Sequence, residues 1–421
     1  MKKNLFAAGL AALTLTGALL LSGCGTVIPA EAQVPEAAQR SAAETYAPAG
    51  SAGYTVTAAA ATAAEESELF SERDLAQTAD LREAKAVTLS DGETAVITEA
   101  GVYVLSGSAK EAQIVVEAGD EDKVQLVLDG LSIVNTDKPC ILVENADKVF
   151  LTSAEGSENT LTVSGRFSGD EDAAVYARDD LVLNGLGTVT ICSSGDGVRC
   201  GDDLKLTGGT WNVTAADTAL KAHDSILVYD GVYVLDAGSD GLHGEDNEDD
   251  SAGCILIQGG SFAIRAGDDG VHAATVVTVN GGTLAISAAE GIEATQVIIN
   301  DGEIAIQASD DGVNAGRKSM SLSVKIEVNG GALTIVMGAG DTDGIDSNGD
   351  LIITGGVIDV TAQSPFDYDG SCTYTGGTII VNGTETNSIT NQMMGGGFGG
   401  PGGMGGPGGQ GGFGGFGGKR S

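Results

Sequence analysis

The chain has 421 residues, of which 42% are hydrophobic but only 4% are aromatic, so it can bury a long core that is mainly aliphatic. Its 59 acidic residues outnumber the 21 basic residues and give a formal net charge of −38. This charge excludes nucleic acid and anionic membrane surfaces as binding partners, and it favours cations or cation-bridged anions.

The N-terminus has the features of an export signal. Lys2 and Lys3 precede an apolar run over residues 5–21, which is short for a membrane span. The run ends in Leu21-Ser22-Gly23-Cys24, which resembles the bacterial lipobox. We therefore expect residues 1–23 to be a lipoprotein signal peptide. Cys24 would then carry the lipid that anchors an extracytoplasmic protein to the cell membrane.

Four further regions are predicted after the signal. Residues 24–64 are rich in Ala, Thr and Pro without periodicity, which predicts a disordered tether. Ser67 to Ala84 predicts a short amphipathic helix that caps the first coil of the domain, with apolar residues on one side. Residues 65–392 form one repeat domain, and residues 393–421 form a disordered glycine-rich tail.

Two short motifs repeat in step through the domain. The first is an acid, a glycine, a branched apolar residue and a polar residue, as in Asp240-Gly241-Leu242-His243 and Asp311-Gly312-Val313-Asn314. The second is a glycine pair, as in Gly281-Gly282-Thr283-Leu284. The branched residues advance by 22 residues from Val198 to Leu220, and by 21 from Ile292 to Val313.

A period of 21–22 residues is typical of a solenoid, because one such unit must stack on its neighbours to bury its apolar face. Within a unit, apolar and polar residues alternate with period two between glycine-containing turns, which leaves no room for a helix. The sequence therefore predicts an all-β protein, a parallel β-helix, in which residues one coil apart lie about 4.8 Å from each other.

Stacking would bring the acids of the repeat into columns, where neighbouring carboxylates repel each other unless a divalent cation lies between them. Oxygen ligands from Asp, Glu and Asn are those that Ca²⁺ selects. We expect calcium ligands among eleven residues: Asp240, Asp268, Asp269, Glu290, Glu293, Asp310, Asp311, Asn314, Asp341, Asp343 and Asp346. The alternative is that the Asp-Gly pairs are only good turn formers.

Two acidic segments support the calcium hypothesis. Residues 341–350 alternate acids and glycines like a calcium loop, without the spacing of an EF-hand. Residues 245–250 place five acids in one insertion, although a solvated charge run has the same composition.

The second column becomes basic toward the N-terminus, where it holds Arg199, Lys221, His243 and His272. These residues would contact a carboxylate-bearing sugar, or one of them would abstract a proton next to such a carboxylate. The alternative is that they only balance neighbouring acids.

Five cysteines remain after Cys24, an odd number whose spacing fits no zinc motif. We expect small core residues, and a Cys192–Cys200 bridge stays open. Trp211 occupies a slot held elsewhere by Phe262 and Leu284, which predicts a core residue.

The lipobox, the Asp-Gly repeat paired with Gly-Gly-Thr, and the glycine-rich tail together resemble a family of bacterial extracellular carbohydrate-binding proteins. The resemblance implies a right-handed parallel β-helix like that of pectate lyases, with bound calcium and with cellulose or acidic sugars such as polygalacturonate as ligands. Its probable calcium ligands here are Asp240, Asp269, Glu290, Asp311, Asp343 and Asp346.

The expected function is that of a non-enzymatic cell-surface lipoprotein that binds polysaccharide through a calcium-loaded β-helix. A calcium-dependent polysaccharide lyase of the pectate type is the first alternative, and Lys221, Arg199 or Arg265 would have to supply its base. A rigid surface spacer or adhesin is the second alternative.

Overall fold

The computed structural model describes residues 69–339 and 342–391. The predicted signal peptide, lipidation site, tether and glycine-rich tail, together with Asp341, lie outside the described residues. Within them no helix is long and apolar enough to cross a membrane.

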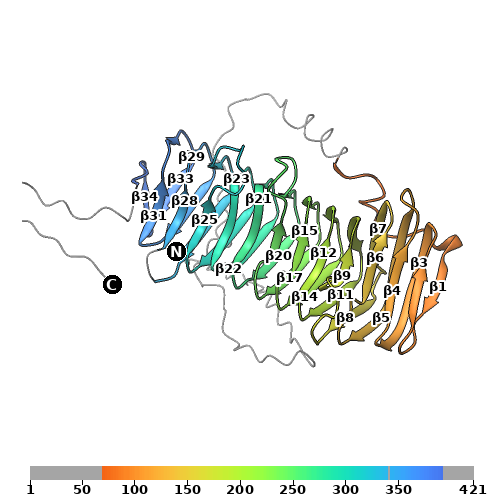
Figure 1. Cartoon of the computed structure of the whole chain (residues 1–421). Coiled ribbons are helices and arrows are strands. Elements are labelled where there is room, and N and C mark those ends of the chain that lie inside the picture. Colours follow the sequence, from red (N-terminus) through yellow and green to blue (C-terminus); the bar gives the residue numbers. More distant parts are fainter. Residues whose placement is uncertain (1–68, 340–341, 392–421) are drawn as a thin grey trace, which may run out of the picture.

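The described chain is a parallel β-helix whose coils follow one another along a rod, from the orange strands to the blue ones in Figure 1. Three series of in-register parallel strands form three faces, named A, B and C here. The last strand, β34 (Thr384–Thr386), pairs antiparallel with β33 and closes the rod. The predicted fold class is confirmed.

Face A contains β1 (Lys85–Thr88), the first parts of β3 (Gly101–Lys110) and β5 (Lys123–Asn135), β7 (Lys148–Ser153), β10 (Asp180–Gly185), β13 (Asp203–Leu206), β16 (Ser225–Val228), β19 (Cys254–Ile257), the second parts of β21 (Asp269–Val279) and β23 (Glu290–Ile299), β26 (Lys325–Val328), β29 (Asp350–Ile353) and β32 (Cys372–Tyr374).

Face B contains the second parts of β3 and β5, β8 (Glu158–Val163), β11 (Thr188–Ser193), β14 (Thr210–Ala215), β17 (Val232–Ala237), β20 (Ser261–Arg265), β22 (Thr283–Ala288), β24 (Glu303–Ala308), β27 (Ala332–Met337), β30 (Val357–Thr361) and β33 (Thr378–Val381).

Face C contains β2 (Thr94–Ile97), β4 (Gln113–Glu117), β6 (Ile141–Asn145), β9 (Ala173–Ala177), β12 (Asp196–Cys200), β15 (Leu220–Ala222), β18 (Leu242–Gly244), the first parts of β21 and β23, β25 (Asp311–Ala315), β28 (Asp343–Ser347) and β31 (Ser364–Tyr368).

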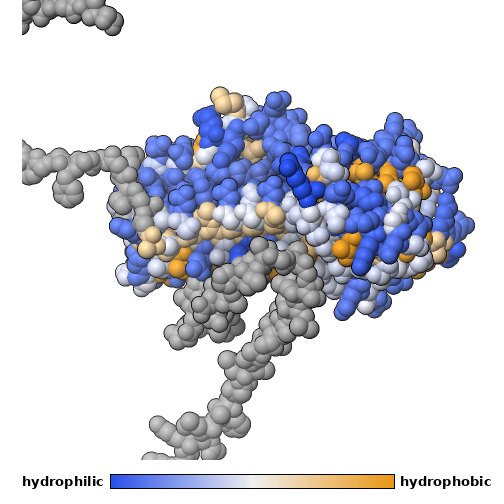
Figure 2. Space-filling view, turned by 60° about the horizontal axis from the view of Figure 1, so that its bottom comes forward, coloured by the Kyte–Doolittle hydropathy of each residue, from blue (hydrophilic) through white to orange (hydrophobic). Residues whose placement is uncertain are grey.

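Apolar residues that point inward alternate with polar residues that point outward along each strand, and the inward residues form the core. In β24, Ile304 and Ile306 are buried inside the coil, whereas Glu303 and Gln307 are exposed. The outside is correspondingly polar, and Figure 2 shows hydrophilic residues over most of one side of the rod, with a narrow band of neutral and hydrophobic residues along it. Trp211 is fully buried and its indole N–H donates to the Gly208 carbonyl, so its predicted place in the core is confirmed.

The two glycine motifs have different physical causes. The glycine of the acid-glycine motif has no room for a side chain, since a Cβ on Gly291 would lie 2.3 Å from the carbonyl oxygen of Gly312 on the next coil. The second glycine of each Gly-Gly pair turns the chain between faces A and B with a positive φ, for example 88° at Gly282. The repeat therefore encodes close stacking and turns.

Leu69 is helical, but the prediction of a helix over Ser67–Ala84 is wrong for residues 70–84, which contain only the three-residue 3-10 helix η1 (Leu81–Glu83). Ser71 and Asp74 instead cap each other, because each backbone N–H donates to the other's side chain, and this closes a turn. Local hydrogen bonding of this kind competes with helix formation.

The N-terminal segment packs along face A instead of capping the first coil. Phe70 lies against the Tyr229 ring, with 5.5 Å between the ring centroids. Asp74 is buried between Lys148 at 3.7 Å and Lys205 at 3.6 Å. These contacts bind the segment to coils in the first half of the rod.

No disulfide joins Cys192 and Cys200, so the bridge that the sequence left open is not formed. Both residues are buried, and Cys200 belongs to the core as expected.

We predict that Gly291→Ala destabilises the protein by about 1–3 kcal/mol, because the added Cβ overlaps the next coil. Urea unfolding measures the change. Gly338→Ala is the matched control, since its Cβ would lie 3.5 Å from the nearest atom, an ordinary contact. Equal stability of the two variants would contradict the stacking argument.

Candidate functional site

The outward-facing polar residues of face C form one continuous column. In-register pairing places nine residues one above the other, and neighbours lie about 4.8 Å apart. We name this set the ligand column: Tyr176, Arg199, Lys221, His243, His272, Glu293, Asn314, Asp346 and Asp367. The predicted stacking of the repeat's polar residues is confirmed.

The acids that open the motifs form a second column beside the first. In-register pairs join Asp269 to Glu290 and Asp311 to Asp343. In several of these acids, one carboxylate oxygen accepts a hydrogen bond from a backbone N–H on the next coil. For example, Asp240 accepts a hydrogen bond of 3.0 Å from the backbone N–H of Asp269 on the next coil. Asp196 and Asp311 accept equivalent bonds from Thr218 and Asp343. The sequence analysis missed this capping role.

At its N-terminal end the ligand column is basic, and its charges are paired. Arg199 lies 3.4 Å from Asp172 and 3.6 Å from Glu245, and Lys221 lies 3.0 Å from Glu245. Glu245 is the first residue of the acidic insertion and directly follows β18, where its backbone N–H donates to the Ala222 carbonyl. Arg265, a candidate base of the lyase hypothesis, instead pairs with Asp236 on face B.

The two histidines follow in the middle of the column. Their rings stack with centroids 4.6 Å apart and planes within 3°. His243 Nδ1 lies 2.6 Å from the carboxylate of Asp240, and His272 Nδ1 lies 2.5 Å from that of Asp269. Each imidazole is therefore oriented by the acid of its own repeat.

Glu293 completes this central part. It lies 3.1 Å from His272 Nδ1, and its carboxylate pairs with Lys318 at 2.6 Å. Burial lowers the pKa of His272, but hydrogen bonds to Asp269 and Glu293 outweigh burial and raise that pKa to about 9. The imidazole is therefore positively charged at neutral pH.

These pairs change the expected set of calcium ligands. Asp240 is hydrogen-bonded to His243, and the charges of Asp269 and Glu293 are already balanced by His272 and Lys318. A hard cation would have to displace protein cations there, at a cost in lost ion pairs. We therefore restrict the candidate calcium site to the C-terminal part of the two columns.

That C-terminal part holds oxygen ligands only, and we name it the oxygen cluster: Asp311, Asn314, Asp343, Asp346 and Asp367. Within the described residues, no ion pair reaches Asp311, Asp346 or Asp367. Glu290 lies at its edge, where the Asn314 amide donates to it over 3.0 Å.

Several buried oxygens around the oxygen cluster have no hydrogen-bond partner in the described structure. They are Asn314 Oδ1, Asp367 Oδ1, Thr342 Oγ1 and Ser364 Oγ. Thr342 is 3% exposed and Ser364 is 1% exposed, so water does not reach them freely. Buried polar atoms are normally satisfied, and four orphaned oxygens in one place indicate a missing partner.

The electrostatics of the oxygen cluster also indicate a missing cation. Burial, and then the carboxylates of Asp311, Asp343 and Asp367, raise the pKa of Asp346 to about 7. Burial also raises the pKa of Asp311 to about 6. Carboxylate, amide and hydroxyl oxygens in a flexible number are the donor set that fits Ca²⁺. The residues present therefore fit a calcium ion.

Other predicted ligands lie elsewhere. Asp268 and Asp310 are exposed, outside the in-register columns, and only Asp310 adjoins the oxygen cluster through its neighbour Asp311. The expected calcium loop at residues 341–350 is wrong, because its described part consists largely of β28 and the start of β29. There Asp350 accepts hydrogen bonds from Ser371, away from face C.

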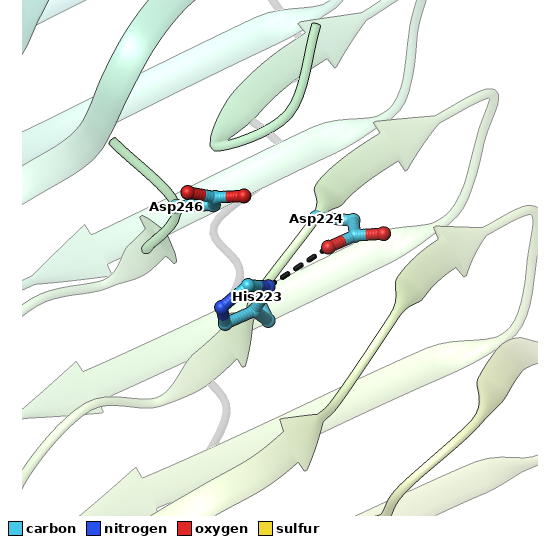
Figure 3. Close-up of side chains that lie close together, drawn as sticks. All are labelled: His223, Asp224 and Asp246. Carbon is cyan, nitrogen blue, oxygen red and sulfur yellow. Dashed lines mark hydrogen bonds and ion pairs between the residues drawn. The ribbon is translucent and has the colours of Figure 1, made fainter. Parts of the chain in front are cut away.

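The insertion at residues 245–250 does not gather its acids around one point either. Asp250 accepts from Ser319 at 2.7 Å, whereas Asp246 lies beside His223 and Asp224. Figure 3 shows these three side chains, with His223 Nδ1 hydrogen-bonded to Asp224 over 2.8 Å. This group mixes an exposed imidazole with two carboxylates and does not match the oxygen cluster.

Sequence reasoning missed four members of the site. Asp367 and Tyr176 stand in degenerate copies, Ser364-Pro365-Phe366-Asp367 and Ala173-Ala174-Val175-Tyr176, which a looser pattern would have found. Glu245 directly follows β18 and lies in the acidic segment 245–250, but only its pairing with Lys221 in the folded chain places it at the column. Lys318 has no local signal, because it reaches Glu293 from the segment after β25 only in the folded chain.

Two known proteins are similar to parts of this chain. A carbohydrate-binding domain-containing protein of Acetivibrio thermocellus is 36% identical over 126 residues, which cover 28% of this chain and 44% of the relative. The chain thus spans less than half of that relative's length. A solved structure of a polysaccharide lyase-like protein from C. thermocellum, a gadolinium derivative, has a TM-score of 0.48 and 29% identity over 52% of this chain and 96% of its own.

The match to a protein family is broader. Residues 91–342, more than half of the chain, match the family of carbohydrate-binding domain-containing proteins. The matched range contains most of the ligand column, from Tyr176 to Asn314. The protein therefore belongs to the family of carbohydrate-binding domain-containing proteins.

Proposed function

We propose that the protein binds an acidic polysaccharide along the ligand column, and that Ca²⁺ held by the oxygen cluster is part of the binding surface. One observation supports this proposal above the others. A chain of a carbohydrate-binding family places five oxygen-bearing side chains together on one face, with orphaned buried oxygens and no cation paired to three of its acids among the described residues.

Asp311, Asn314, Asp343, Asp346 and Asp367 would hold the ion. When bound, calcium supplies positive charge that balances these carboxylates and offers sites to which sugar carboxylates and hydroxyls coordinate. Such a bridge matters for this chain, because a net charge of −38 otherwise repels an acidic polymer.

The ligand column suits a polymer better than a single sugar. Its nine residues span about 38 Å at the usual spacing of parallel strands. The basic and imidazole groups in its first half offer hydrogen-bond donors and positive charge to sugar carboxylates, while the oxygen cluster occupies the second half. A neutral glucan such as cellulose would need neither feature.

A calcium-dependent polysaccharide lyase is the second candidate, and the orientation of His243 favours it. The carboxylate of Asp240 hydrogen-bonds to Nδ1 of His243, which is how a carboxylate orients an imidazole for proton transfer. Arg199 and Lys221 pair with Glu245, and His272 is already protonated, so His243 is the better base.

We further propose that Cys24 anchors the protein to the outer face of a bacterial membrane. The proposal depends on the lipobox-like Leu21-Ser22-Gly23-Cys24. Expression of the full chain in a bacterium should give a membrane-bound product labelled by radioactive palmitate. Cys24→Ser should be unlabelled and should leave the membrane fraction, whereas equal labelling of both would contradict the anchor.

Calcium should stabilise the fold. At a Ca²⁺ concentration a hundred times its Kd, we expect the free energy of unfolding to rise by about 2.7 kcal/mol relative to chelator. Asp346→Asn should lose most of this rise, whereas Asp301→Asn, at an exposed turn, should keep it. Calorimetry with Ca²⁺ or EDTA measures both, and superimposable melting curves would contradict a calcium site.

The pH dependence without calcium has a definite sign. The folded-state pKa of Asp346 is raised to about 7, so between about pH 4 and pH 7 the folded state binds a proton that the unfolded chain has released. Stability in EDTA should therefore fall as pH rises through this window. The fall should be smaller in Asp346→Asn, which cannot ionise.

Polysaccharide binding should depend on calcium. We expect the full chain to be retained on immobilised polygalacturonate with Ca²⁺ and to elute with EDTA. Retention on cellulose alone would favour a neutral ligand, and retention on no glycan of a broad panel would favour a spacer. Ultraviolet absorbance from unsaturated uronides would establish the lyase, and His243→Ala should then remove it.

A further inference from the structure

A cleft of about 570 Å³ opens beside the basic end of the ligand column. Arg166, Phe167, Asp172 and Ser194 line it, together with Gly165 and Gly195. Its volume lies within the range of small-molecule sites. Asp172 connects the cleft to the column, because its carboxylate pairs with Arg199 over 3.4 Å.

An insertion builds the wall of the cleft. Nine residues, 164–172, join β8 to β9, whereas only Ser194 and Gly195 join β11 to β12 on the next coil. The insertion is held at several points. Ser168 donates its backbone N–H to the Asp137 carbonyl over 2.9 Å, and Glu171 pairs with Arg178 at 2.6 Å.

Gly195 lets the insertion pack closely against the next coil. A Cβ on Gly195 would lie 2.2 Å from the carbonyl oxygen of Asp172 and 3.0 Å from the ring of Phe167. Any side chain there would push against the insertion and its aromatic ring.

Arg166 is the polar group of the cleft that the fold does not use. It is exposed and makes no hydrogen bond or ion pair with any described residue. Asp172 pairs with Arg199, so Arg166 is the cation of the lining that no described acid pairs with. A guanidinium presents two parallel N–H donors, which match a carboxylate.

The other lining groups suit a sugar ring. Phe167 is partly buried and packs against the core, so its ring is held in place and offers an apolar surface. Ser194 donates its hydroxyl to the Gly165 carbonyl and keeps oxygen lone pairs for a sugar hydroxyl. An anionic, hydroxyl-rich ring with one apolar side complements this set.

We infer that this cleft binds a uronate unit of the polysaccharide, with the sugar carboxylate on Arg166 and the ring against Phe167. The neighbouring units of the same chain then continue onto the ligand column past Arg199. The inference rests on the proposed function and adds the chemical feature that the cleft selects, a free carboxylate.

The test measures binding of an oligogalacturonide and of its fully methyl-esterified form by calorimetry, with Ca²⁺ present and with the full chain. Arg166→Ala should weaken oligogalacturonide binding about tenfold, since it removes charge-assisted hydrogen bonds. It should leave binding of the ester unchanged. Phe167→Ala should weaken both ligands, because ring contact does not depend on the carboxylate.

Arg82→Ala is the matched control, because it removes one positive charge from an exposed arginine far from the cleft in sequence and on the first coil. The inferred uronate site would be contradicted if Arg166→Ala bound oligogalacturonide as tightly as wild type. It would also be contradicted if Arg166→Ala and Arg82→Ala lost affinity equally. Either result would leave the proposed function intact. Wild-type protein that binds no oligogalacturonide would overturn both. Melting temperatures confirm that Arg166→Ala, which breaks no internal contact, is folded.

Discussion

The in-register stacking of parallel strands is the constraint on which the rest of this structure depends. A spacing of about 4.8 Å puts identical positions of successive coils in van der Waals contact. Inside the coil this spacing stacks aliphatic side chains into a continuous core. On the outside of face C the same spacing stacks carboxylates, which repel each other by about 1 kcal/mol per pair even in water.

The repulsion between carboxylates is offset by protein cations in one half of face C but not in the other. In the first half of the ligand column, Arg199, Lys221 and the two histidines balance the acids, and the insertions add Glu245 and Lys318 to the network. In the second half, Asp311, Asp346 and Asp367 face each other with burial and no paired protein cation in the described chain. One face thus presents a half in which cations and acids are paired and a half that is rich in oxygen ligands, with the Arg166 cleft beside the first half.

Sequence reasoning succeeded for features that depend on the repeat and failed for features that depend on contacts between residues far apart in the chain. The fold and the columns were predictable, because a strict period of 21–22 residues transmits register from one coil to the next. The helix prediction was wrong over residues 70–84, since the burial of Asp74 between Lys148 and Lys205 outweighs the local apolar pattern. Residues 342–350 are mainly strand instead of the expected loop, because an Asp-Gly pair that suggests a loop also begins strands of face C such as β25 and β28.

The sequence alone determined the solenoid, the faces of its strands and the stacking of the repeat's polar residues, because these follow from short-range alternation and from a period counted along the chain. The tertiary structure alone decided which acids are already paired and which are left facing each other. That outcome depends on insertions returning to face C from outside the repeat, and on how deeply each carboxylate is buried. Neither property has a local signature, so the narrowing from eleven candidate ligands to one cluster required the folded chain.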